Sequence, residues 1–140
     1  MIDWRLTTDL LRANPDFHHR PCYDYVIIQA SNTEVFFAQI LYIFGITLNN
    51  TETHVALVLP FDEIPDRQHR ELDEALHFTR VQARHRSKAT FIHVESIVRG
   101  AVLVKDYEAE HNDEYIIMDV LDADLWWRMK SVSLARHVRI

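Results

Sequence analysis

The sequence predicts a mainly β fold built from antiparallel strands. About seven short segments are rich in β-branched and aromatic residues, and polar turn segments separate them. Strands do not alternate with helices along the chain, so nothing requires a parallel sheet. A chain of 140 residues has the length of one domain with one core. We therefore expect a single domain over residues 1–140, folded as an antiparallel barrel or sandwich.

Apolar runs and apolar alternation mark the expected strands. They are predicted at residues 23–29, 35–44, 54–59, 78–84, 90–94, 101–104 and 115–120. The first two form a hairpin through residues 31–33, and a polar loop at residues 49–51 follows a bend near Gly45. Pro60 is expected to end the third strand, because proline cannot donate a hydrogen bond within a sheet. Residues 61–76 are acidic and contain proline, which predicts a loop with one helical turn.

Short helices are expected near both ends of the chain. A threonine cap predicts a helix that ends near Arg12, within an N-terminal extension of residues 1–22. An aspartate cap predicts a second helix over residues 122–132, within a C-terminal region of residues 122–140. The strands between these ends would form the body of the domain.

Catalytic motifs are absent from the sequence. The serines lack a Gly-x-Ser-x-Gly elbow, and Cys22, the single cysteine, has no nucleophile signature and no disulfide partner. With Gly45 and Gly100 as the only glycines, a glycine-rich phosphate loop is excluded. Gly100 stands ahead of an expected strand, where we expect a positive φ or a close backbone approach. These absences predict a non-enzymatic protein without a cofactor.

Nine histidines raise the question of a metal site. His18, His19 and Cys22 lie close together in the sequence, but adjacent histidines usually point apart and the set offers at most three ligands. We therefore predict no bound metal. An accessory domain of a metal-dependent nuclease or transposase stays open as an alternative.

Neither a membrane segment nor a secretory signal is visible. The longest apolar run, residues 35–44, has about half the length that a membrane helix needs. The N-terminus lacks a basic segment followed by an apolar one. We expect an intracellular protein with no membrane partner.

Charge is divided into two adjacent blocks. Residues 78–105 hold six Lys and Arg residues against one acid, whereas residues 106–124 hold eight acids and no Lys or Arg. Such blocks could steer a charged partner. They could equally be two solvated surfaces, or contact each other.

The basic block suggests a nucleic-acid contact. Its candidate residues are Arg80, Arg84, Arg86 and Lys88. In the expected strand at residues 78–84, a period of two places Arg80 and Arg84 on one face, which we expect to point to solvent. A row of cations could contact phosphates. No aromatic residue is interleaved with them for base stacking.

Aromatic residues suggest a peptide contact instead. Tyr42, Phe44 and Phe61 come from the end of one expected strand and from the loop after the next, and could enclose a methylated ammonium. Trp126 and Trp127 on the last expected helix cannot both face inward, so one of them could contact a partner. Core packing is the alternative for all five residues, and an oligomerisation surface is an alternative for the two tryptophans.

The order of three segments resembles a bromo-adjacent homology (BAH) domain. These are residues 35–44 (VFFAQILYIF), 56–61 (ALVLPF) and 91–104 (FIHVESIVRGAVLV). They are similar to the family's Ala-Arg-Ile-like strand, its strand ending in aromatic residues, and its Val-x-x-Ile-x-Gly-x-x-x-Val closure. Gln39 stands where the family usually has arginine, and Pro60-Phe61 where it often has tryptophan and another aromatic residue. The resemblance implies an SH3-like β-barrel that binds chromatin, a histone or DNA, with residues 91–104 mainly as scaffold.

A second resemblance covers the first part of the chain. It rests on Asp3-Trp4-Arg5, Thr8-Asp9, Leu11-Arg12, Pro15-Asp16-Phe17-His18, Pro21, Tyr23-Asp24 and Val26. These residues, leading into the strand at residues 35–44, look like a domain of proteins encoded by mobile elements of mushroom-forming fungi. The resemblance implies a nuclear, transposon-derived protein in which this domain contacts the rest of a longer polypeptide.

Overall fold

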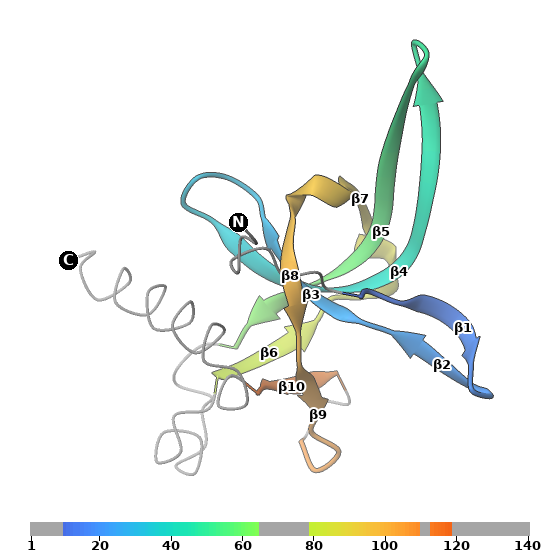
Figure 1. Ribbon diagram of the computed structural model, residues 1–140. Coiled ribbons are helices and arrows are strands. Elements are labelled where there is room, and N and C mark those ends of the chain that lie inside the picture. Colours follow the sequence, from blue (N-terminus) through green and yellow to red (C-terminus); the bar gives the residue numbers. More distant parts are fainter. Residues whose placement is uncertain (1–9, 65–78, 110–112, 119–140) are drawn as a thin grey trace, which may run out of the picture. The chain divides into compact units, whose positions relative to one another are not determined.

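A computed structural model describes residues 10–64, 79–109 and 113–118 (Figure 1). Most of these residues lie in strands, and the strands pair antiparallel in both parts of the sheet structure. The expectation of a mainly β, antiparallel fold is therefore confirmed. The chain divides into two compact units. Unit 1 comprises Met1–Asp62 with Ala83–Gly100, and unit 2 comprises Glu63–Gln82 with Ala101–Ile140.

Unit 1 contains most of the strands. They are β1 (Ala13–Phe17), β2 (Arg20–Tyr23), β3 (Tyr25–Gln29), β4 (Val35–Leu48), β5 (Thr51–Glu63), β7 (Thr90–His93) and β8 (Ile97–Ala101), with the short 3₁₀ turns η2 (Arg86–Lys88) and η3 (Val94–Ser96). Strands β1 and β2 form a separate hairpin. The larger sheet of this unit has the order β8-β3-β4-β5, and β7 also pairs with β5.

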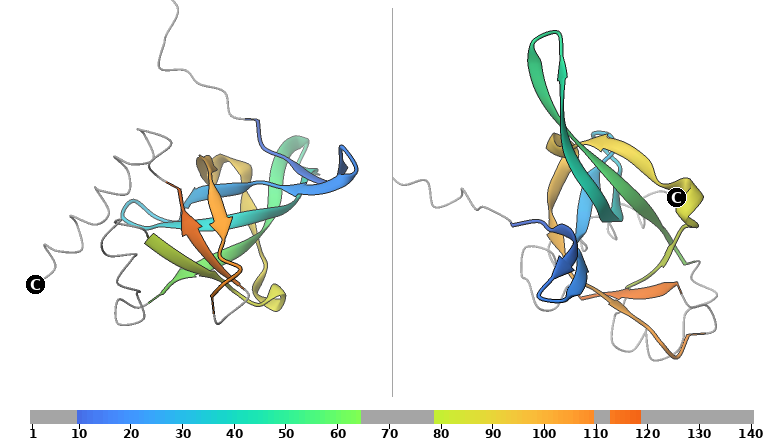
Figure 2. Two further views of the ribbon diagram at one scale, coloured as in Figure 1. Left: turned by 90° about the horizontal axis from the view of Figure 1, so that it is seen from below. Right: turned by 90° about the vertical axis from the view of Figure 1, so that its right-hand side faces the viewer.

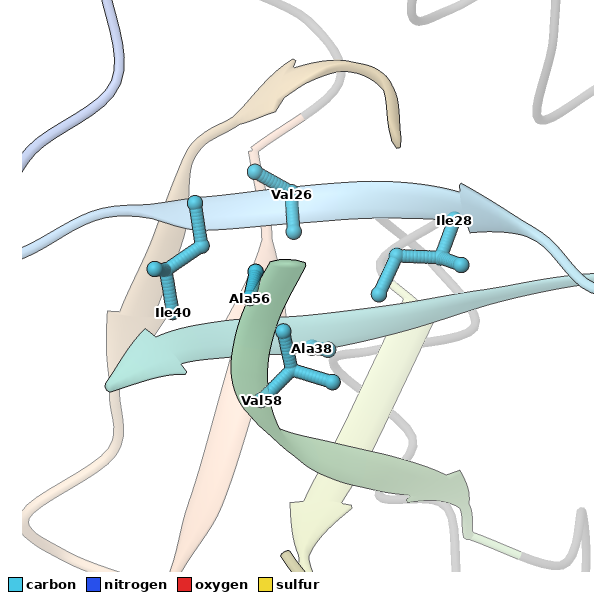
Figure 3. Close-up of a cluster of buried hydrophobic side chains, with 6 residues drawn as sticks. All are labelled: Val26, Ile28, Ala38, Ile40, Ala56 and Val58. Atoms are coloured by element: carbon cyan, nitrogen blue, oxygen red, sulfur yellow. The ribbon is translucent and has the colours of Figure 1, made fainter. Parts of the chain in front are cut away.

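The core of unit 1 lies on one face of β3, β4 and β5. Each strand contributes two residues at alternate positions, so their side chains share a face. These residues are Val26, Ile28, Ala38, Ile40, Ala56 and Val58, all almost completely buried. Figure 3 shows their side chains meeting between the three strands. Branched side chains from three neighbouring strands thus bury the apolar surface that holds the sheet together.

Strands β4 and β5 form one long hairpin. They pair up to Leu48 and Thr51, and the turn residues Asn49 and Asn50 both have a positive φ, as a type I′ turn requires. Gly45 pairs with His54 within the ladder and does not end or divide the strand. The two strands are therefore longer than the sequence predicts, and their distal half extends beyond the other strands of unit 1 (Figures 1 and 2).

Pro60 lies inside β5 instead of ending it. The carbonyl of Pro60 accepts a hydrogen bond from the Arg84 backbone nitrogen at 3.1 Å. Because the N–H and C=O of one strand residue point to the same edge, the missing N–H of Pro60 faces away from β4. The β4–β5 ladder, where Pro60 faces Ala38, loses no bond, so the strand continues.

The helix predicted near the N-terminus is wrong for the residues that the structure describes. Residues 10–12 are not helical, and β1 begins at Ala13. The Arg12 nitrogen donates to Asp24 Oδ2 at 2.7 Å, and the Asp24 nitrogen donates to the Arg12 carbonyl at 2.9 Å. These two bonds fix the base of the β1–β2 hairpin. The helix predicted over residues 122–132 lies outside the described residues.

The stretch at residues 91–104 differs in detail from the expected strand pair. After β7, η3 turns the chain into β8, which begins at Ile97 and not at Ala101. Val102 then separates β8 from β9. Neither glycine of the chain has a positive φ, so the positive φ expected at Gly100 is not found.

Unit 2 is built around three short strands. They are β6 (Thr79–Ala83), β9 (Leu103–Lys105) and β10 (Glu114–Ile117), in the order β6-β10-β9. Val81, Leu103 and Ile117 are its buried apolar side chains on these strands. Among the described residues, the pairings of neither unit close into a barrel: they run from β8 to β7 in unit 1, and from β6 to β9 in unit 2.

Candidate functional site

The outer face of β4, β5 and β7 is the side of unit 1 opposite its core. Residues directly opposite in an antiparallel ladder share a face. Tyr42 lies opposite Leu57, which lies opposite Phe91 on β7. In the next row, Phe44 lies opposite Val55. The intervening β5 positions, Ala56 and Val58, face the core, so these two rows point outward.

Three aromatic rings gather on this outer face. The ring centroids of Tyr42 and Phe44 are 5.6 Å apart with an interplanar angle of 32°, and those of Phe44 and Phe91 are 5.9 Å apart at 89°. Tyr42 is 59% exposed and Phe91 64% exposed. We call the surface formed by Tyr42, Phe44, Phe91, Val55 and Leu57 the aromatic face.

The aromatic face places two exposed aromatic side chains beside half-buried apolar ones. Large apolar patches are uncommon on the surfaces of monomeric proteins and often mark contacts with partners. Rings set at nearly right angles also present both faces and edges, which can attract another aromatic ring or a cation. The aromatic face therefore offers apolar and aromatic contacts to a binding partner.

Phe61, predicted to join Tyr42 and Phe44, is instead a core residue. It is only 5% exposed and packs against Tyr25, with ring centroids 5.9 Å apart. Phe61 is four positions beyond Leu57, the partner of Tyr42, which is about 13 Å along a strand. Phe91 takes the third place at the rings. In the sequence, the alternation of side chains around Ile92 indicates that Phe91 and Ile92 lie on opposite faces of a strand. It does not indicate that β7 pairs with β5, which is what brings Phe91 to the other two rings.

Arg80 does not face solvent, contrary to the prediction. It is 5% exposed in unit 2, where its Nη1 lies 2.6 Å from Asp106 Oδ2 and 3.7 Å from Glu114 Oε2. Next to it, Gln82 donates to both carboxylate oxygens of Asp113 at 3.2 Å. The period of two in β6 is correct, but acids from the following segment cover the face that carries Arg80. Arg80 is therefore unavailable to phosphates.

Arg84 is exposed but already holds a carboxylate. Its Nε donates to both oxygens of Asp62 at 2.9 Å, and its Nη2 donates to Asp62 Oδ1 at 2.7 Å. Hydrogen bonding to Asp62, followed by the charge of Asp62, raises the pKa of Arg84 above the ordinary value, and desolvation opposes this slightly. Because the two charges of the Arg84–Asp62 pair cancel, the pair attracts an anion only weakly.

Arg86 and Lys88 lie in the exposed turn η2. His85 Nδ1 accepts a hydrogen bond from the Ser87 nitrogen at 3.2 Å and lies 2.9 Å from Ser87 Oγ, which holds the turn. Of the four predicted phosphate-binding residues, these two are exposed, and within residues 10–64, 79–109 and 113–118 neither makes a two-point hydrogen bond to a carboxylate as Arg84 does. Two neighbouring cations do not make the expected row of four.

The remaining predicted residues do not add to this site. Trp126 and Trp127 lie outside the described residues. In the described part of the chain, no three His, Cys, Asp or Glu side chains are grouped so that they could hold a metal ion, and His18, His19 and Cys22 are not brought together for that purpose. No described helix is both long and apolar enough to cross a membrane.

Comparisons with protein-family models, with curated proteins and with solved structures found no match to this chain. The resemblance to BAH domains and to transposon-encoded proteins therefore stays a prediction. The arguments about function rest on the residues and contacts described above.

Proposed function

We propose that this chain is a non-enzymatic protein-binding module that holds a segment of a partner protein against its aromatic face. One observation carries the proposal: Tyr42, Phe44 and Phe91 lie together on the outer face of the sheet, with two of the rings more than half exposed. Burial of such rings in an interface is a large source of binding free energy.

Charge supports a protein partner over a nucleic acid. Arg80 is buried with two acids, and Arg84 is engaged by Asp62. Strong nucleic-acid binding depends on several cations that neutralise phosphates together. Only Arg86 and Lys88 of the predicted set remain suited to that role. DNA is therefore the second candidate, and it rests on those two residues.

The proposed partner is a chromatin protein, and the proposed compartment is the nucleus. Both follow from the BAH-like order of segments, which also implies a barrel-like body. A histone tail with a methylated lysine would suit the three rings, because a methylated ammonium is attracted to ring faces and is only weakly hydrated. Unlike the trio predicted from the sequence, the proposed cage uses Phe91 in place of Phe61.

A histone peptide array tests this proposal. The wild-type protein is expected to bind at least one methylated lysine peptide more strongly than its unmodified form. Phe91→Ala and Phe44→Ala should each weaken that binding roughly tenfold, since one cation–π contact is worth about 1–2 kcal/mol in a desolvated site. Circular dichroism would check that both variants keep their β structure.

Tyr107→Ala is the matched control. Tyr107 is 84% exposed and contacts Lys105, but it belongs to unit 2 and not to the aromatic face. It should therefore leave peptide binding unchanged. A wild-type protein that binds no peptide on the array would contradict the histone partner. Equal losses in Tyr107→Ala and Phe91→Ala would contradict the aromatic face.

A further inference from the structure

Among the strands that the structure describes, the distal part of β4 has a neighbour along one edge only. Strand β3 pairs with β4 only at residues 35–39, and one further bond joins the Ile40 nitrogen to the Asp24 carbonyl. From residue 41 to Leu48, the strand that pairs with β4 in the described part of the chain is β5 alone. Figures 1 and 2 show this part of the hairpin extending away from β3 and β7.

This edge lacks the features that normally keep strand edges apart. Proteins protect exposed edges with lysine, proline, other charges or bulges. Strand β4 contains no charged residue and no proline over its whole length, and its single irregularity, between Ile40 and Tyr42, lies at the very start of the exposed part. An isolated two-stranded ribbon is also only marginally stable in water. A third strand on this edge would stabilise it.

We propose that the unpaired edge of β4 pairs antiparallel with the same edge of a second copy of this chain, about a twofold axis at Gly45. A strand that pairs antiparallel with itself satisfies both copies equally, which is the geometry of a closed twofold interface. The result is a four-stranded sheet, with β5 on the outside of each copy. This inference does not depend on the proposed function.

The side-chain pattern sets the register at Gly45. With Gly45 facing Gly45, Phe44 faces Ile46 of the second copy and Tyr42 faces Leu48 of the second copy. These four side chains share one face of β4, so the register joins two apolar faces, whereas a shift by one residue would place them beside polar positions such as Thr47. The central pair of glycines also brings no side chains together at the axis.

Charge favours a second copy as the occupant. The chain is acidic, with a net charge of −6, so two copies carry a net repulsion. The hairpin is an exception, because Glu52 is its only acid in residues 41–57 and lies 3.6 Å from His54. Both residues are on β5, one strand away from the proposed seam. An uncharged edge matches an identical uncharged edge without repulsion.

Thr47→Lys tests the pairing without weakening the hairpin. Thr47 is exposed and lies opposite Glu52, so a lysine there gains a favourable cross-strand neighbour within its own copy. In the dimer, however, it places a charge beside Ile43 of the second copy. The matched control is Thr51→Lys, which adds the same charge at an exposed position on β5, on the far side of the ribbon.

Light scattering coupled to size exclusion gives the readout over a roughly hundredfold range of protein concentration. As the concentration increases, the measured molar mass of wild type and of Thr51→Lys is expected to rise from 16.6 kDa towards twice that value. Thr47→Lys should raise the dissociation constant of the dimer at least about tenfold. A monomeric wild type overturns the proposal. So does a dimer that Thr47→Lys leaves intact and Trp127→Ala abolishes.

Cross-linking tests the register. In a Cys22→Ser background, Gly45→Cys should form a disulfide-linked dimer under mild oxidation, because facing Cβ atoms at the axis come within disulfide reach. A Cβ on Gly45 would lie 3.2 Å from Glu52 Oε1, the end of a flexible side chain that can move. Thr51→Cys in the same background should form no disulfide-linked dimer, because position 51 lies on β5, away from the seam. A dimer without the Gly45→Cys disulfide overturns the register.

Discussion

Arginine side chains that lie within seven residues of one another meet three different environments. Arg80 is buried between Asp106 and Glu114, Arg84 holds Asp62 at the surface, and Arg86 is exposed in a short turn. The sequence predicts a strand at Arg80 correctly but wrongly turns its side chain to solvent. It does not show which acids, more than twenty positions away in both pairs, will cover which arginine. Long-range pairing of this kind decides whether a cation is a binding residue or part of a core.

Substitution by methionine should separate the buried ion pair from the surface one. Arg80→Met leaves two nearly buried carboxylates without their cation, which we expect to lower the free energy of unfolding by roughly 3–5 kcal/mol. Arg84→Met removes a solvent-exposed pair and should cost less than about 1 kcal/mol. Urea denaturation of both variants measures the difference. Equal losses would contradict the distinction drawn between the two arginines.

At the scale of elements, the sequence predicts some hairpins correctly and misses another, and the turn residues explain the difference. The β3–β4 hairpin was predicted, because two apolar runs and the polar residues between them mark it clearly. The β4–β5 turn also fits its sequence, since asparagine tolerates a positive φ. The β1–β2 hairpin was missed, because His18 and His19 occupy its turn at φ values of 50° and 66°, where glycine or asparagine would be expected.

A glycine at position 19 should stabilise the β1–β2 hairpin. His19 has a side chain in a left-handed conformation, which costs about 1 kcal/mol relative to glycine. His19→Gly keeps the contact between the Phe17 and His18 rings, whose centroids are 4.4 Å apart. We expect slower amide hydrogen exchange at Asn14 and Cys22, which pair across this hairpin.

Arg20→Gly is the control for this substitution. Arg20 lies in β2 next to the turn and has no positive φ, so glycine there should only add flexibility to the unfolded chain and speed the exchange. Faster exchange in His19→Gly than in the wild type would show that the two histidines are not strained.

At the scale of the molecule, the described residues bring part of the basic block against part of the acidic block. The basic residue Arg80 and the polar Gln82 contact acids that follow them in the chain, all within unit 2. Mutual contact, one of the alternatives open from the sequence, therefore holds for this part of the blocks. The aromatic face lies in unit 1 and involves neither block. The mainly β, antiparallel character was predictable from local patterns, whereas the site depended on which strands pair, which those patterns leave open.

Binding to duplex DNA should accordingly be weak and depend only modestly on salt. If Arg86 and Lys88 are the two cations of the predicted set that reach phosphates, the logarithm of the binding constant should fall with the logarithm of salt concentration with a slope of about −2. All four predicted residues acting together would give a slope of about −4. Fluorescence anisotropy with a labelled duplex measures the slope.

Arg86→Glu should reduce the remaining binding strongly, whereas Arg20→Glu, the same charge reversal at another exposed arginine, should reduce it much less. A slope near −4 would show that Arg80 and Arg84 leave their carboxylates to bind DNA, and would favour the nucleic-acid function over the aromatic face.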